Sequence, residues 1–446
     1  MPKGLRLISC LLPILLGGAI ASAEETDALA FADLERPEHD YWNRTPKDPF
    51  TRLIGDLESG RLALDESSEK AYLVSLLKVL KIPASTQTLV YSTTSLQLRL
   101  ISPQSPRAIY FNEEIYLGYV PGGKIEIVSI DPELGAIFYI FDIPKGGARP
   151  VAERSQRCMN CHSDEDTREV PGIVIKSVVP GPSGGSLESY RRGLTGHEIP
   201  LSDRFGGWHV TGGDNLGKHW GNLTGRLSPE GLQTTSLLPG TQFDWSTFPV
   251  ATSDVLAHLL HEHQAGFVNR VVETHYRLRT ALANGKGRFL ETDRADMERQ
   301  VGELTRYLLF ADEAPLPEGG IAGDPQLKEE FLATRRPAAG GESLRDFELK
   351  THLFRNRCSY MIYTPLFQSL PEGFRRRIYD RMARALAASP VDAEFAHLRP
   401  DEKARLRGIL AETVPDWPGG SLGECQDRRK ANRSSSHRAD LHRLPQ

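Results

Sequence analysis

Two cysteines and a histidine stand together in the segment RCMNCHSD, which covers residues 157–164 of the 446-residue chain. Cys158 and Cys161 are two of only five cysteines in the sequence, and His162 follows the second one directly. The C-x-x-C-H spacing suits three kinds of site: a covalently attached haem, a zinc site or a redox dithiol. Each kind requires a fold that holds these side chains close together, so the segment constrains the structure around it.

The N-terminus predicts export. Residues 1–23 begin with two basic residues, continue with an apolar run over 7–20 and end in Ala-Ser-Ala, which is the order of a secretory signal peptide. Cys10 is a poor lipoprotein anchor, because most of the apolar run follows it. That run is too short to span a bilayer, and no later stretch of about 18 apolar residues occurs. We therefore expect a mature chain in the periplasm or outside the cell, without a transmembrane span.

The charge of the mature chain argues against a nucleic-acid partner. The signal peptide holds two basic and no acidic residues, and the tail after Cys425 holds six basic and two acidic residues. The body over 24–425 therefore carries 46 basic against 56 acidic residues, a net charge of −10. Nucleic acids need a basic protein face for their phosphates, which this body does not offer. The polar basic tail has too little apolar content to pack, and we expect it to be disordered.

Strand and helix signals change along the chain and predict an α+β fold. Between Thr88 and Phe141, short runs rich in β-branched and aromatic residues alternate with turn residues, which is typical of antiparallel hairpins. Three further elements are expected from local patterns: a helix at 68–81, a strand at 173–179 and a helix that begins after Ser253. The predicted order is a signal peptide (1–23), an acidic mixed segment (24–86), a β-rich region (87–150), a haem-attachment region with Gly- and Trp-rich loops (151–250), a helical region (251–412) and a disordered tail (413–446).

Covalent haem is the chemistry that the spacing and the compartment favour together. In such a site the two sulfurs add to vinyl groups on one edge of the porphyrin, and the adjacent histidine supplies an axial nitrogen to the iron. A zinc site would need further ligands, and Cys358 and Cys425 stand alone and far from the motif. A thioredoxin-like dithiol would follow a strand in a βαβ unit, whereas this pair follows a hairpin region. We predict one covalent haem c on Cys158 and Cys161, with His162 as the proximal axial ligand.

The two remaining cysteines of the expected mature chain give weaker signals. Cys358 lies among apolar residues and is expected to be a buried small hydrophobe. An oxidising compartment would permit a disulfide between Cys358 and Cys425, but the sequence leaves that pairing open.

The segment CMNCH resembles the haem-attachment motif of c-type cytochromes. The chain is also similar to a family of secreted bacterial proteins that contain one cytochrome c motif of this kind. That similarity lies in four segments between about residues 87 and 390: SPQSPRAIYFNEEIYLGYV, FGGWHVTGG with KHWGN, SDVLAHLLHEHQ and LFRNRCSYMIY. The resemblance implies haem binding and leaves the reaction open. Members of the family often have Thr-His-Gly where this chain has Gly213-Asp214-Asn215, so any role of that histidine is absent or moved here.

The sixth position of the iron has several candidates. No methionine occurs between Met159 and Met297, so we expect a histidine, a later methionine or an open position. His219 ranks first, because the glycines around it allow the backbone to approach a flat ring closely. His197, in a similar loop, ranks lower.

The helix expected after Ser253 adds a third candidate, His263. Its spacing places His263 on an apolar seam and puts His258 and His261 on the wetter side. The predicted seam consists of Leu256, Leu260, His263, Phe267 and Val271.

Two classes of function follow from one covalent haem. An electron-transfer protein would fill both axial positions and exchange electrons with a redox partner protein. A peroxidase- or oxidase-type enzyme would keep the sixth position open or exchangeable for a small-molecule oxidant. We rank electron transfer first, and we rank a zinc-binding or other non-haem binding module third.

Overall fold

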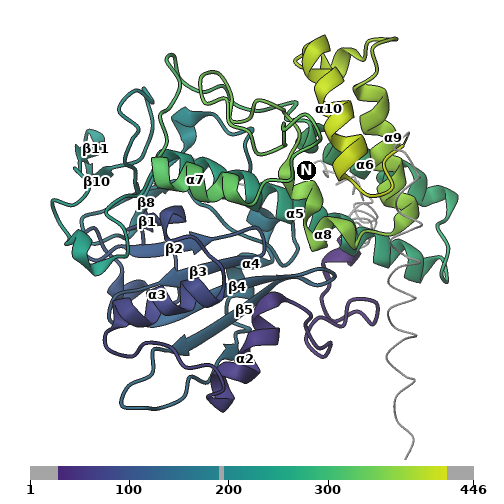
Figure 1. The fold of residues 1–446 in the computed structure, drawn as a ribbon. Helices are drawn as coiled ribbons and strands as arrows, with labels where there is room; N and C mark the ends of the chain where they lie inside the picture. Colours follow the sequence, from purple (N-terminus) through teal and green to yellow (C-terminus); the bar gives the residue numbers. More distant parts are fainter. Residues whose placement is uncertain (1–28, 190–194, 419–446) are drawn as a thin grey trace, which may run out of the picture.

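Hairpins in the N-terminal half build a seven-stranded antiparallel sheet (Figure 1). The structure is a computed structural model that describes residues 29–189 and 195–418, so the predicted signal peptide, most of the predicted tail and Cys425 lie outside the described residues. The strand order is β6-β5-β4-β3-β2-β1-β9, and every neighbouring pair is antiparallel. The strands are β1 (Thr88–Val90), β2 (Arg107–Phe111), β3 (Ile115–Tyr119), β4 (Lys124–Asp131), β5 (Gly135–Asp142), β6 (Glu153–Arg154) and β9 (Trp208–His209).

Two helices cover one face of this sheet (Figure 1). In α2 (Pro49–Ser59), Phe50 packs its ring 5.0 Å from Tyr139 and 6.0 Å from Phe141 of β5. The predicted helix at 68–81 is α3 (Glu69–Val79), and its N-cap Ser68 accepts a hydrogen bond from the Ala71 amide. Side chains on a strand alternate between faces, so Phe138 and its cross-strand neighbours face the other way.

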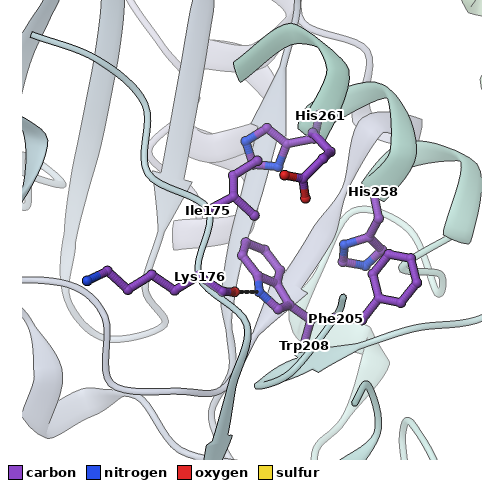
Figure 2. Close-up of a pocket in the computed structure, with 7 residues that line it drawn as sticks. Ile175, Lys176, Phe205, Trp208, His258 and His261 are labelled. Carbon is purple, nitrogen blue, oxygen red and sulfur yellow. Dashed lines mark hydrogen bonds between the residues drawn. The ribbon is translucent and has the colours of Figure 1, made fainter. Parts of the chain in front are cut away.

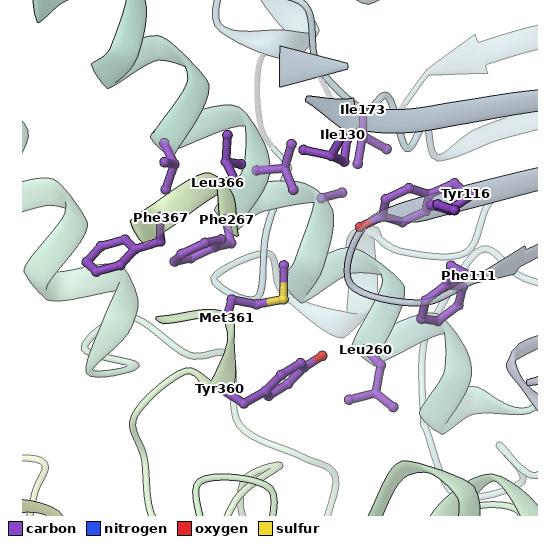
Figure 3. Close-up of a cluster of buried hydrophobic side chains, with 14 of the residues drawn as sticks. Phe111, Tyr116, Ile130, Ile173, Leu260, Phe267, Tyr360, Met361, Leu366 and Phe367 are labelled. Atoms are coloured by element: carbon purple, nitrogen blue, oxygen red, sulfur yellow. The ribbon is translucent and has the colours of Figure 1, made fainter. Parts of the chain in front are cut away.

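The other face of the sheet packs against α5 (Val255–Asn284), a helix of 30 residues. Figure 3 shows side chains of this buried cluster: Phe111 and Tyr116 of the sheet, Leu260 of α5, and Tyr360 and Met361 of the C-terminal part of the chain. The α+β prediction is confirmed, because the strands of the large sheet precede the long helices in the chain.

The prediction of a one-sided α5 is wrong. Of its 30 residues, 23 are buried, and His258 and His261 are only 6% and 3% exposed. The helix is covered on one side by the sheet and on the other by the C-terminal part of the chain, so every residue from Val255 to Tyr276 except Arg270 is buried. The helices after α5 are α6 (Arg294–Leu308), α7 (Pro325–Ala333), α8 (Pro365–Gln368), α9 (Glu372–Ala385) and α10 (Pro400–Thr413).

The loop region over 151–250 contains more pairing than the sequence predicts. Of the strand expected at 173–179, only the end is a strand, because β7 (Val178–Pro180) pairs with β8 (Ser186–Ser189). A second hairpin joins β10 (Leu223–Ser228) to β11 (Gly231–Ser236). Cys358 is fully buried, as predicted. Among the described residues, no helix combines the length and the apolar character needed to cross a membrane.

Two turn glycines of the large sheet give a matched test of its contact with α5. Gly122 and Gly135 have φ angles of 72° and 82°, where an L-residue is strained. A Cβ at Gly122 would meet nothing within 4 Å, but a Cβ at Gly135 would lie 2.7 Å from Val272 of α5. We expect Gly122→Ala to lower the free energy of unfolding by about 1 kcal/mol through strain alone. Gly135→Ala should lower it by about 3 kcal/mol, because overpacking adds to the strain.

Urea unfolding followed by circular dichroism measures both losses. Equal losses for the two variants would contradict the close packing of β5 on α5.

Candidate haem-attachment site

The two cysteines and the histidine lie within one turn of backbone. The short helix α4 (Met159–His162) carries Cys161 and His162, and Cys158 is its N-cap residue. Cys158 is half-buried, Cys161 is exposed, and neither forms a disulfide. Met159 points into the core. The structure therefore presents two free thiols and an imidazole within one turn.

A backbone carbonyl fixes the orientation of the His162 ring. Its Nδ1 atom lies 2.9 Å from the carbonyl oxygen of Gly172, and the Gly172 amide donates back to the carbonyl of His162 at 2.9 Å. Because a carbonyl can only accept, Nδ1 carries the proton and Nε2 is left as the basic nitrogen. Metal-bound histidines are typically held this way, with the second nitrogen donating to a carbonyl or carboxylate.

Burial keeps the His162 imidazole neutral. It lowers the pKa of His162 to about 4, against the opposing effect of the hydrogen bond to Gly172. The ring is then unprotonated at neutral pH, which is the form that binds a metal.

An apolar stretch of the sheet lies beside α4. The His162 ring is 4.6 Å from the ring of Phe138 on β5, and Phe138 is paired with Val128 on β4. The neighbouring row on the same face includes Ile109 and Ile140, which are half-buried like Val128. A porphyrin is a flat and largely apolar group, so this surface beside the thiols suits it chemically.

One ion pair interrupts this apolar surface. Arg107 and Glu126 lie 2.8 Å apart, and each side chain is 16% exposed. Both are close enough to influence the pKa of Cys158 and of His162. Gly118 lies beneath them, and a Cβ there would be 2.8 Å from the Arg107 guanidinium. The pair was not anticipated from the sequence.

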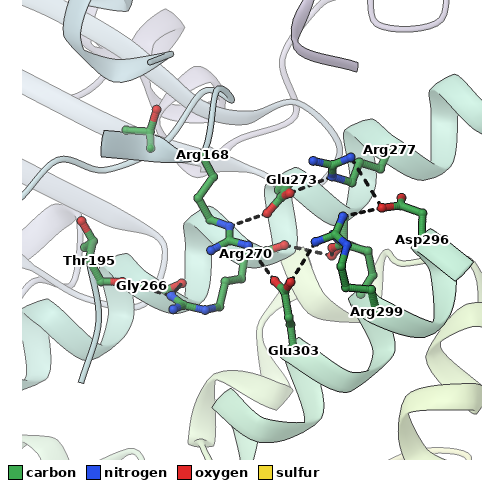
Figure 4. Close-up of polar contacts among 12 residues, drawn as sticks. Arg168, Thr195, Gly266, Arg270, Glu273, Arg277, Asp296, Arg299 and Glu303 are labelled. Atoms are coloured by element: carbon green, nitrogen blue, oxygen red, sulfur yellow. Dashed lines mark hydrogen bonds and ion pairs between the residues drawn. The ribbon is translucent and has the colours of Figure 1, made fainter. Parts of the chain in front are cut away.

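Ion pairs connect the segment after α4 to the helical half (Figure 4). Arg168 pairs with Glu273 of α5 and, at 2.6 Å, with Glu303 of α6. Arg277 also pairs with Glu273, at 2.7 Å. Burial raises the pKa of Glu273, but the two guanidinium groups outweigh it and hold that pKa below its ordinary value. Residues 157–173, named the attachment segment for their predicted role, are therefore fixed to α5 and α6 as well as to the sheet.

The predicted sixth-ligand histidines form contacts with residues other than His162. His197 and His263 contact each other, with 2.7 Å between their Nδ1 atoms, and His263 Nε2 lies 2.8 Å from the hydroxyl of Ser359. Both nitrogens of His263 are therefore engaged, one by a loop histidine and the other by Ser359. His219 accepts a hydrogen bond from the Gly221 amide at 3.0 Å and has its ring 6.0 Å from Phe205.

His261, which the helical spacing places on the wetter side of α5, lies over the same sheet face as His162. The His261 ring stacks on Phe111 at 4.9 Å and on Tyr116 at 5.5 Å. Phe111, Tyr116, Val128 and Phe138 form one cross-strand row, so His261 and His162 lie over opposite ends of it. A helical wheel gives no signal for this position, because α5 is buried on nearly all sides.

A small cavity adjoins His261 (Figure 2). Its volume of about 10 Å³ has room for no more than one water molecule. The Trp208 indole donates to the carbonyl of Lys176 at 2.9 Å, and the Lys176 ammonium pairs with Asp166 at 2.7 Å. The cavity is lined by Ile175, Lys176, Phe205, Trp208, His258, His261 and Glu262.

Two observations bear on the alternatives to haem. Burial raises the pKa of the Cys158 thiol, whereas a reactive dithiol depends on a lowered one. Within residues 29–189 and 195–418, no group of three or more His, Cys, Asp or Glu side chains is placed to hold a metal ion. Comparison of the chain with protein-family models, curated proteins and solved structures gives no match.

The anchoring of the attachment segment can be tested at Arg168. Arg168→Gln would leave Glu273, which is 5% exposed, with one cation instead of two. We expect this variant to lose about 2 kcal/mol of unfolding free energy, the typical value of a hydrogen bond to a buried charge. Arg299→Gln is the matched control, because Arg299 is 43% exposed and should cost less than about 1 kcal/mol.

The difference in unfolding free energy between wild type and Arg168→Gln should depend on pH. The pKa of Glu273 is lowered from its ordinary value of 4.5, so its ion pairs stabilise the fold above that pH and lose their effect as the pH falls through the folded value. The difference between wild type and Arg168→Gln in urea unfolding should therefore shrink as the pH falls below 4.5. A difference that stays constant from neutral to acid pH would contradict this assignment.

Proposed function

We propose that the protein is an exported c-type haem protein that carries one covalent haem on Cys158 and Cys161 and uses it for electron transfer. The single observation that carries the proposal is the His162 ring, whose Nδ1 donates to the Gly172 carbonyl in the same turn as two free thiols. That arrangement leaves Nε2 for an iron. When bound, the haem supplies an iron that cycles between two oxidation states.

Residues of this chain could supply the thioether links, the proximal ligand and the apolar contacts of such a site. Cys158 and Cys161 would form the thioether links, and the neutral His162 ring would be the proximal ligand without first losing a proton. The half-buried Ile109, Val128 and Ile140 offer apolar contact. Burial and hydrogen bonding of the ligand are the protein's means of setting a haem potential.

A partner has direct access to this segment. Cys161 is exposed, and a hollow of about 790 Å³ opens beside α4. Trp42, Arg157 and Asn160 are among the residues that line it. A redox partner protein or a small-molecule oxidant could reach the attachment segment from this side.

A peroxidase- or oxidase-type enzyme is the second candidate, and the contacts of the predicted sixth ligands favour it. His197 and His263 are bonded to each other, and His261 lies over the opposite end of the cross-strand row from His162. An open sixth position would bind a small-molecule oxidant, whereas an electron carrier fills that position. The spin state of the iron therefore separates the two functions.

Covalent attachment is the first test. The protein is made in a host that installs haem c, and the pyridine haemochrome spectrum is recorded. Wild type should give a c-type spectrum with one haem per chain, and Cys161→Ala should lose the two-thioether spectrum. Cys358→Ala, which removes a buried thiol elsewhere in the chain, should keep it. A colourless wild-type protein would end the proposal.

The electronic spectrum of the ferric protein is the second test. For an electron carrier we expect a low-spin spectrum that cyanide does not change, because both axial positions are filled. A high-spin spectrum that shifts with peroxide would assign the enzyme function instead.

The same spectrum tests the sixth ligand. His219 is the ligand that ranks first from the sequence. A high-spin spectrum in His219→Ala would identify it as the ligand, and an unchanged low-spin spectrum would remove that prediction.

A further inference from the structure

One peptide unit connects the ring of His162 to a buried side chain of α5. The Gly172 carbonyl accepts the hydrogen bond from His162 Nδ1 at 2.9 Å. The amide N–H of the same peptide unit belongs to Ile173, and it donates to Oδ1 of Asn269 at 2.8 Å. The three groups therefore form a continuous chain of hydrogen bonds from the imidazole to α5.

Asn269 bonds to the backbone of Ile173 through both its amide oxygen and its amide nitrogen. Besides accepting from the Ile173 N–H, its Nδ2 donates to the Ile173 carbonyl at 2.9 Å. Asn269 is 1% exposed, so water does not compete for these bonds. They also explain why the strand predicted from Ile173 is absent at its start, since the backbone groups of Ile173 pair with a side chain.

The backbone at residue 172 approaches Asn269 of α5 closely because glycine has no side chain. A Cβ at Gly172 would lie 2.4 Å from Oδ1 of Asn269 and 2.9 Å from Thr167. The Pro171 carbonyl accepts from the Ala136 amide of β5 at 3.0 Å. The Gly172 peptide is thus fixed between the sheet and α5.

The physical link is the peptide plane. Its C=O and N–H point to opposite sides and are rigidly coupled, so holding the N–H also fixes the direction of the carbonyl. Hydrogen bonds in such a chain polarise one another, so the acceptor at Ile173 makes the Gly172 oxygen a stronger acceptor for His162. A stronger bond at Nδ1 makes the ring a more basic metal ligand.

We infer that Asn269 is a positioning residue that sets the orientation and donor strength of His162 through the Gly172–Ile173 peptide. This inference rests on the proposed haem function. Asn269 acts on the iron only through His162, and it favours the oxidised state by making that ligand more electron-rich.

The test is an equilibrium redox titration of the haem-loaded protein against a mediator couple. In Asn269→Ala the Ile173 N–H loses its acceptor, and we expect the equilibrium constant for reduction to rise about tenfold, by analogy with the smallest effects that such substitutions have on metal affinity. Asn269→Asp keeps an oxygen at the same place, so its constant should equal the wild-type value or fall below it. Asn269→Ser repeats the measurement if the alanine variant does not fold.

Gln264→Leu is the matched control. Gln264 is a buried amide on the same helix, and it bonds to Tyr116 at 3.1 Å and to Tyr360 at 2.9 Å. This variant should lose stability without changing the reduction equilibrium, because Gln264 has no bond to the Gly172 peptide.

The outcomes separate the two proposals. An unchanged equilibrium constant in Asn269→Ala, or an equal rise in Gln264→Leu, would overturn the role of Asn269 and leave the haem function standing. A rise of the same size in Asn269→Asp would also overturn it, because a shared loss of packing would then be the cause. A wild-type protein without covalent haem would remove both.

Discussion

The burial of α5 is the constraint on which the rest of the structure depends. A helix that is covered by a sheet on one side and by other helices on the opposite side has little contact with water, so its buried polar side chains need partners inside the protein. Asn269 bonds to the backbone of Ile173, Glu273 pairs with arginines, and Gln264 bonds to two tyrosines. These partners come from the sheet side, the attachment segment and the C-terminal part of the chain, so α5 joins all three.

The sequence predicts the local elements of this fold well. Alternating strands with glycine and proline turns specify the hairpins of the large sheet, and Ser68 marks the start of α3 with an observed cap. These features depend on neighbours in the chain. The surroundings of α5 depend on segments far away in the sequence, so a wheel that divides it into apolar and wet sides places His258 and His261 wrongly.

The candidate site likewise combines features set by neighbouring residues with features set by distant segments. Cys158, Cys161 and His162 are recognised from spacing alone, because their chemistry requires them to be adjacent. The Gly172 carbonyl lies ten residues further on, and Asn269 lies more than a hundred residues from His162. No short pattern links these positions, since the contact exists only after the sheet and α5 have packed together. Ranking the other histidines by local glycines or by helical spacing fails to anticipate the pairing of His197 with His263 for the same reason.

The absence of a side chain at Gly172 couples two distant positions in the chain. Asn269 occupies the space that a methyl group at residue 172 would need, so alanine there is compatible only with a smaller side chain on α5. Relatives that keep this geometry should therefore vary at the two positions together or at neither. A sequence with a bulkier residue at 172 and asparagine still at 269 would have to route the segment after its attachment motif along a different path.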